Sequence, residues 1–177
     1  MFKDKILLIT GGTGFFGNAA HKKFWKEYDI LDVLQFKKII TDFSPTHVVY
    51  LAAKTGLNEK KLSEFAANIE GVENLIQILK AIPFVEQVVF TSSLLVCRMG
   101  YVPKYDTDYQ PTTLYGESKV EGEKVVWAHK DLPFAWTIIR PILIWGPWIT
   151  EPFTNFFKLI SKGLYFHIGS GHCFCFY

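Results

Sequence analysis

A glycine-rich segment near the start of the chain constrains the fold more than any other feature. Residues 11–17 read Gly-Gly-Thr-Gly-Phe-Phe-Gly and directly follow the apolar run Ile6–Ile9, which is typical of a strand. Glycine has no Cβ, so this backbone can turn tightly and approach a phosphate closely. The N–H groups at the start of a following helix can then hold that anion. Packing alone could also require glycines here, but their place between strand and helix favours a dinucleotide pyrophosphate site.

Each glycine of this segment has a predicted role. We expect Gly11 to make the turn out of the strand, Gly14 to lie against the pyrophosphate and Gly17 to let the helix pack near the strand.

Strands and helices are predicted to alternate along the rest of the chain. Near-continuous apolar strands between amphipathic helices are typical of a parallel sheet covered on both faces. The predicted fold class is therefore α/β, with a doubly wound parallel sheet of the Rossmann type. The expected strands are residues 6–10, 47–52, 87–91 and 135–140, and the expected helices are 15–26, 33–43, 60–81, 114–129 and 153–162.

Composition argues against several classes of protein. Among the 177 residues, 49% are hydrophobic and 20% are charged, which does not favour disorder. A net charge of +2 gives no electrostatic footprint for nucleic acid. No apolar run approaches the roughly 18 residues of a membrane span, and the first residues do not resemble a secretion signal. The three cysteines fit a reducing cytoplasm, and Cys173 and Cys175 lie too close together for a usual metal pair, so we expect no metal.

A second motif, Tyr115-Gly-Glu-Ser-Lys119, follows about a hundred residues after the glycines. Tyr115 and Lys119 are four residues apart on a predicted helix and therefore share a face. A nearby ammonium is expected to lower the pKa of the tyrosine, whose phenolate could then take a proton from a hydroxyl group beside a nicotinamide. This spacing often occurs by chance on a surface helix, but the preceding glycine turn favours the catalytic interpretation.

Together these segments resemble the extended short-chain dehydrogenase/reductase superfamily, and within it the NAD-dependent epimerase/dehydratase family. The resemblance extends over nearly the whole chain. It is carried by the GxxGxxG spacing, Asp29-Ile-Leu-Asp32, Val48–Ala53, Asn68-Ile-Glu-Gly71, the Tyr115–Lys119 motif and Arg140-Pro141. The pattern is most similar to the nucleotide-sugar epimerases and dehydratases.

The resemblance implies a set of site residues. The catalytic residues would be Ser93, Tyr115 and Lys119, with Ser92 as the alternative serine. A nucleotide-sugar substrate would contact Ser93 and Asn155. The cofactor would be NAD, with NADP not excluded, and it would contact Gly11, Gly14, Phe15, Phe16, Gly17, Asp29, Ile30, Leu51, Ala52, Ala53, Lys54, Asn68, Thr91, Tyr115, Lys119, Pro141 and Ile142.

The resemblance also implies a domain organisation and an assembly. Residues 1–150 would form the NAD-binding domain, and residues 151–177 would begin a smaller substrate-binding domain that is mostly missing from this sequence. A homodimer would form through the helices at 60–81 and 114–129.

The chain departs from the family pattern in two further places. The predicted helix 15–26 runs almost directly into Asp29, so the second strand, which would end in the acid that holds the adenosine ribose, is absent. Family dehydratases carry Asp-Glu after the catalytic residue, whereas Leu94 and Leu95 follow Ser93, which favours epimerisation. The rival hypotheses are an NAD(P)H-dependent carbonyl reductase and a regulatory module that binds a dinucleotide without chemistry.

Overall fold

The computed structural model describes residues 5–11, 28–56, 58–129, 131–142 and 158–164. The chain divides into two compact units, residues 1–142 and residues 143–177. In the second unit, residues 158–161 are helical, within the predicted helix 153–162, whose first residues lie outside the described ranges.

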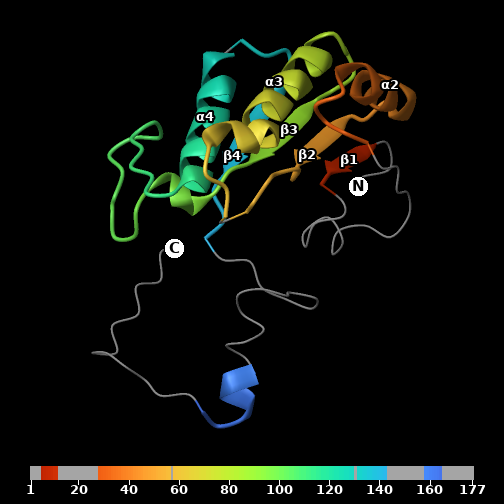
Figure 1. Ribbon diagram of the computed structural model, residues 1–177. Helices are drawn as coiled ribbons and strands as arrows, with labels where there is room; N and C mark the ends of the chain where they lie inside the picture. The colour runs from red at the N-terminus through yellow and green to blue at the C-terminus, as the bar shows by residue number, and fades with distance from the viewer. Residues whose placement is uncertain (1–4, 12–27, 57, 130, 143–157, 165–177) are drawn as a thin grey trace. The chain divides into compact units, whose positions relative to one another are not determined.

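A four-stranded parallel sheet forms the centre of the first unit (Figure 1). Its strands are β1 (Leu7–Thr10), β2 (His47–Tyr50), β3 (Gln87–Thr91) and β4 (Ala135–Ile139), hydrogen-bonded in that order. The parallel sheet predicted from the sequence is confirmed. Among the described residues, β1 pairs only with β2, and the segment 12–27 that precedes Asp29 lies outside them.

Among the described residues, three α-helices accompany the sheet; two agree with their predicted bounds to within one residue, whereas the helix predicted at 60–81 begins only at Ala66. They are α2 (Val33–Phe43), α3 (Ala66–Lys80) and α4 (Leu114–Ala128), with short 3₁₀ helices η1 (Leu62–Phe65) and η2 (Leu94–Val96) before α3 and after β3. Helix α2 begins after Asp32, whose carboxylate accepts from the Gln35 N–H, and ends at Ser44 in the left-handed region. The predicted helix 15–26 lies outside the described residues.

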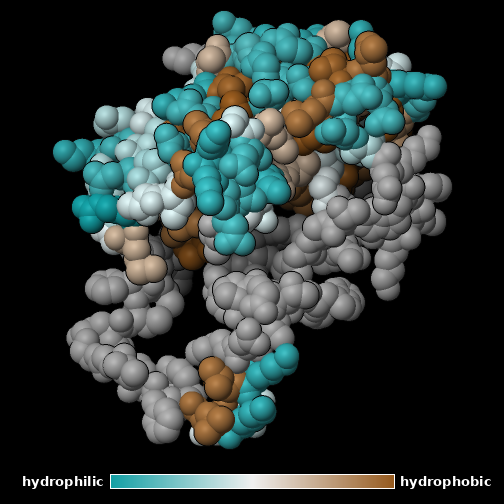
Figure 2. Space-filling view, in the orientation of Figure 1, coloured by the Kyte–Doolittle hydropathy of each residue, from teal (hydrophilic) through white to brown (hydrophobic). Residues whose placement is uncertain are grey.

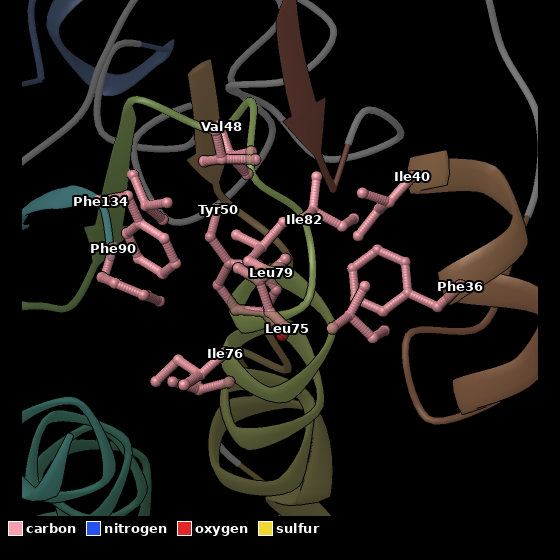
Figure 3. Close-up of a cluster of buried hydrophobic side chains, with 14 of the residues drawn as sticks. Phe36, Ile40, Val48, Tyr50, Leu75, Ile76, Leu79, Ile82, Phe90 and Phe134 are labelled. Carbon is pink, nitrogen blue, oxygen red and sulfur yellow. The ribbon is translucent and has the colours of Figure 1, made fainter. Parts of the chain in front are cut away.

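The three helices share one core with the sheet. In Figure 1, α3 and α4 lie in front of the strands, and α2 lies beside them at the end of the sheet near β1. Alternate side chains of β2 and β3 point towards these helices because successive strand residues face opposite sides. Figure 3 shows this core, whose most buried members are Phe36 and Ile40 of α2, Val48 and Tyr50 of β2, Leu75, Ile76 and Leu79 of α3, Val88 of β3 and Val126 of α4.

Two strand ends differ from the sequence prediction for identifiable reasons. Strand β2 ends at Tyr50 instead of residue 52, because the Leu51 and Ala52 N–H groups donate to the Thr10 hydroxyl oxygen, both at 3.1 Å. Strand β4 ends one residue early, at Ile139, and the next side chain, Arg140, bonds to α4.

The surface of the described residues carries both hydrophilic and hydrophobic side chains. Figure 2 shows hydrophilic residues over much of this face, with hydrophobic residues exposed among them. Among the residues that the structure describes, no helix combines the length and apolar character needed to cross a membrane.

Candidate active site at the carboxyl edge of the sheet

The carboxyl ends of the parallel strands bring most of the predicted residues to one edge. Gly11 follows β1, residues 51–54 follow β2, Ser92 and Ser93 follow β3, and residues 140–142 follow β4. The first two turns of α4 carry Tyr115 and Lys119 to the same edge, where Lys119 contacts the end of β3. Ligands of open α/β sheets bind at such an edge.

Gly11 has the backbone that its predicted role requires. Its φ of +69° lies in the left-handed region, and a Cβ built on it would be 2.7 Å from the Ala52 nitrogen. The turn out of β1 therefore passes directly against the loop after β2, and no side chain fits between them. The fully buried Thr10 holds this crossing together through its two bonds to Leu51 and Ala52.

Lys119 is a buried cation fixed to the end of β3. Only 6% of the residue is exposed, and its Nζ donates to the Thr91 carbonyl oxygen at 3.0 Å. Burial lowers the pKa of Lys119 to about 8, and the negative charge of Glu123 acts against that change.

Tyr115 differs from the sequence-based expectation in one respect. Burial, the larger effect, raises the pKa of Tyr115 above its ordinary value, while a side-chain hydrogen bond with Ser93 lowers it. The Lys119 ammonium lies 5.9 Å from the centre of the Tyr115 ring and donates to Thr91 instead of the phenol. The expected lowering of the tyrosine pKa by Lys119 is therefore not a property of this arrangement.

The two candidate serines occupy different environments. Ser93 caps η2, where its Oγ accepts from the Leu95 N–H at 3.2 Å, and it acts to lower the pKa of Tyr115. The Ser92 Oγ is buried and has no hydrogen-bond partner in the described part of the chain. Of the alternatives, Ser93 is the serine that the fold brings to the tyrosine.

Asn68 of α3 forms hydrogen bonds to the loop after β2 and to helix α4. Its Nδ2 donates to the Lys54 carbonyl at 2.9 Å and to the Ser118 Oγ at 2.8 Å, and its Oδ1 accepts from the Lys54 N–H at 2.8 Å. Asn68 thus holds the loop after β2 and helix α4 against α3.

The remaining cofactor candidates differ in exposure. Asp29 is exposed and caps a turn by accepting from the Leu31 N–H, whereas the Ile30 side chain lies in the hydrophobic core. Lys54 pairs with Glu59 at 3.3 Å, and Ile142 is exposed. Ala53 is half-buried, and the Pro141 carbonyl accepts from the Leu94 N–H at 3.1 Å. Gly14, Phe15, Phe16, Gly17 and Asn155 lie outside the described residues.

Sequence reasoning missed a buried polar group beside Lys119. Glu123 is 2% exposed and binds both Arg140 and the Tyr109 hydroxyl. Its spacing of four residues from Lys119 was the available signal, because residues one helical turn apart share a face. Within the described ranges, no cluster of His, Cys, Asp or Glu could hold a metal ion.

Comparison with known sequences identifies related proteins. UDP-glucuronate 4-epimerase 4 of Arabidopsis thaliana is 33% identical over 150 residues, which cover 79% of this chain and 34% of the relative. UDP-glucose 4-epimerase of Vibrio cholerae is 30% identical over 198 residues, covering 94% of this chain and 60% of the relative. This match is longer than the 177-residue chain, so the relative has residues inside the matched range that this chain lacks.

Solved structures share the fold. WbmG of Bordetella bronchiseptica, solved with NAD, superposes with a TM-score of 0.72 at 24% identity, covering 89% of this chain and 59% of that one. UDP-glucose 4-epimerase of Brucella ovis, also with NAD, gives 0.65 at 19% identity, covering 76% and 50%. These likenesses establish a Rossmann-type fold.

The family model of the NAD dependent epimerase/dehydratase family matches residues 18–163, which is most of the chain. This match agrees with the names of the two relatives above. The chain spans 34% of the length of the first relative and 60% of the length of the second. The chain therefore belongs to the NAD-dependent epimerase/dehydratase family.

Proposed function

We propose that this protein is an NAD-dependent nucleotide-sugar epimerase that works by transient oxidation of a sugar hydroxyl. The observation that carries the proposal is the meeting of Ser93, Tyr115 and Lys119 at the carboxyl edge of the sheet. Two curated relatives at 30% identity or more are named UDP-sugar 4-epimerases, which supports a UDP-sugar as the substrate.

The described part of the edge fits the cofactor that defines the family. At Gly11 the backbone takes a positive φ in a crossing too close for a Cβ, and Lys119 places a buried cation at the end of β3. We propose that Gly11, the loop from Leu51 to Lys54 and Lys119 contact NAD. Bound there, NAD would supply a reversible hydride acceptor for the sugar carbon.

The protein's own residues would handle the proton. Tyr115 takes the hydroxyl proton of the sugar as general base, and Ser93 hydrogen-bonds the same reacting oxygen. Because burial raises the pKa of Tyr115, the phenolate needs nearby positive charge, which the oxidised nicotinamide of bound NAD would add. Leu94 and Leu95 follow Ser93, so this position offers no acid/base pair for eliminating water, and epimerisation is favoured over dehydration.

Two wider features belong to the same proposal. A substrate-binding domain would begin near residue 151 and supply Asn155 to the nucleotide sugar. A homodimer would form through the faces of α3 and α4. Family resemblance supports both features.

Tyr115→Phe tests the function directly. The variant should lose at least a hundredfold in the interconversion of UDP-glucose or UDP-glucuronate with its 4-epimer, because the phenol oxygen that carries the proton is gone. Tyr105→Phe is a matched control, since Tyr105 is 64% exposed in the loop before α4. Product formation is followed by NMR of the sugar ring protons.

Two results would contradict the proposal. Substantial residual turnover in Tyr115→Phe would remove the tyrosine from its role. Stoichiometric oxidation of NADPH with a keto-sugar, without epimerisation, would favour a reductase; dTDP-4-dehydrorhamnose reductase of Bacillus anthracis, solved with NADP, shares the fold with a TM-score of 0.71 at 20% identity.

A further inference from the structure

A buried carboxylate lies one helical turn beyond Lys119, and the proposed chemistry gives it no task. Glu123 receives a forked pair of bonds from Arg140, with Nε to Oε1 at 2.8 Å and Nη2 to Oε2 at 2.5 Å. The Tyr109 hydroxyl also donates to Oε2, at 2.9 Å. Charge-assisted bonds of this kind fix both the position and the orientation of a carboxylate. Glu123 is thus held rigidly from β4 and from the loop before α4.

Glu123 and Lys119 line the same cavity. Its volume of about 20 Å³ is enough for one water molecule. The Thr91 and Ser92 hydroxyls, which also line it, are buried without a hydrogen-bond partner among the described residues. Lys119 and Glu123 make no direct ion pair in this structure, since the ammonium donates to Thr91. The cavity therefore has room for one water molecule beside both charges, within a lining that is mainly apolar.

The charged groups around this cavity affect whether Lys119 keeps its proton. A buried ammonium is unfavourable unless an opposite charge or strong acceptors compensate it. Tyr115 and Glu123 face Lys119 from its own helix, Tyr50 lines the cavity from β2, and Arg140 and Tyr109 lie behind the carboxylate. Asn68 of α3 and the ends of β3 contribute only uncharged groups. Among these described groups, Glu123 is the one acid.

We propose that Glu123 is a positioning residue of the site: clamped by Arg140 and Tyr109, it keeps the buried Lys119 ammonium charged and in place across the small cavity. The proposal deepens the epimerase assignment, because Lys119 is one of the three residues assigned to that site. It also stands apart from that assignment, since the charge of Lys119 is a property of the protein before any substrate binds.

The sign of the effect follows from the charges. The Glu123 carboxylate favours the charged form of Lys119 and so raises its pKa, against the larger lowering by burial. Removing the carboxylate charge must therefore lower the pKa of Lys119 further. Lys119 would then lose its proton at a lower pH.

The experiment is an NMR titration of Lys119 in the full chain, without substrate. The protein is labelled with ¹³C at the lysine side chains, and Lys119→Arg assigns the signal. In Glu123→Gln the amide keeps an oxygen for Arg140 and Tyr109 but loses the charge. The titration midpoint of Lys119 should fall by about one pH unit or more relative to the unchanged protein. Glu121→Gln, on the same helix beside the exposed Lys124, should leave the midpoint where it is.

A second variant covers the risk that Glu123→Gln does not fold, because it leaves the partly buried Arg140 without an ionic partner. Glu123→Gln with Arg140→Gln removes both charges, and its midpoint should lie below that of the unchanged protein and above that of Glu123→Gln. Tyr109→Phe removes one bond to Glu123 but keeps the charge, so its midpoint should move least.

Circular dichroism establishes which variants are folded. An unchanged Lys119 midpoint in folded Glu123→Gln, or in the folded double variant, overturns the proposal and leaves Glu123 a purely structural role. An equal shift in Glu121→Gln also overturns it, because the effect would then not belong to the cavity. If the shifts appear and UDP-sugars are not epimerised, the proposed function fails while the role of Glu123 stands.

Discussion

Replacing Thr10 by valine should loosen the edge of the sheet that forms the candidate site. Thr10 is fully buried, and its Oγ1 accepts from the N–H groups of Leu51 and Ala52, both at 3.1 Å. Valine has nearly the same shape, so the change leaves two backbone donors without an acceptor and opens no cavity. A buried donor left without a partner costs about 1–3 kcal/mol, and both donors are only half-buried, so we expect a loss of about 2–4 kcal/mol.

Urea unfolding measures this loss. With a slope of about 2 kcal/mol per molar urea, the midpoint should fall by about 1–2 M. Thr10→Ser is the matched control, since it keeps the hydroxyl and loses only a methyl group, at about 1 kcal/mol. If Thr10→Val were as stable as the unchanged protein while Thr10→Ser were weaker, packing of the methyl group would be the role of Thr10, and our reasoning would be wrong.

Three further changes test the packing and charge of the site. Gly122→Ala places a Cβ 2.4 Å from the Asn68 carbonyl and should lower the free energy of unfolding by about 1–3 kcal/mol, whereas Glu121→Ala on the same helix should change it by no more than about 0.5; equal effects would refute close packing. Ser118→Ala removes the partner of the Asn68 amide at 2.8 Å and should cost about 1–3 kcal/mol in thermal unfolding, and an unchanged midpoint would show that the bond is dispensable. Between about pH 8 and pH 10.5, Lys119 binds fewer protons in the folded state than in the unfolded state. As the pH rises through that window, the free energy of unfolding of the unchanged protein should therefore increase by about 3 kcal/mol relative to that of Lys119→Met. Urea unfolding measures this difference, and a difference that does not change with pH would contradict the lowered pKa.

The order of elements along the first unit could be predicted from local patterns. The strand at Gln87–Thr91 and the helix at Val33–Phe43 match their predicted bounds, because an apolar run and a capped amphipathic stretch are both short-range signals. The end of β2 could not be predicted in this way. Thr10 terminates that strand from 41 residues away by accepting the N–H of Leu51.

Part of the site could also be predicted from the sequence. The Tyr115–Lys119 spacing predicted a shared helix face, and the structure gives both residues to α4. The direction of the Tyr115 pKa shift could not be predicted from the sequence, because it depends on burial and on Ser93, which lies on another segment. The placement of Glu123 by Arg140 and Tyr109 required three segments to fold together.

The sequence by itself determined the family, the alternation of strands and helices, and the identity of the residues at the carboxyl edge. These follow from spacing and hydrophobic periodicity, which are properties of neighbouring residues. The tertiary structure alone decided which serine contacts Tyr115, where Lys119 places its ammonium and which acid balances its charge. Burial and charge are set by what packs around a group, and the residues that pack around Lys119 come from β3, α3 and α4 together.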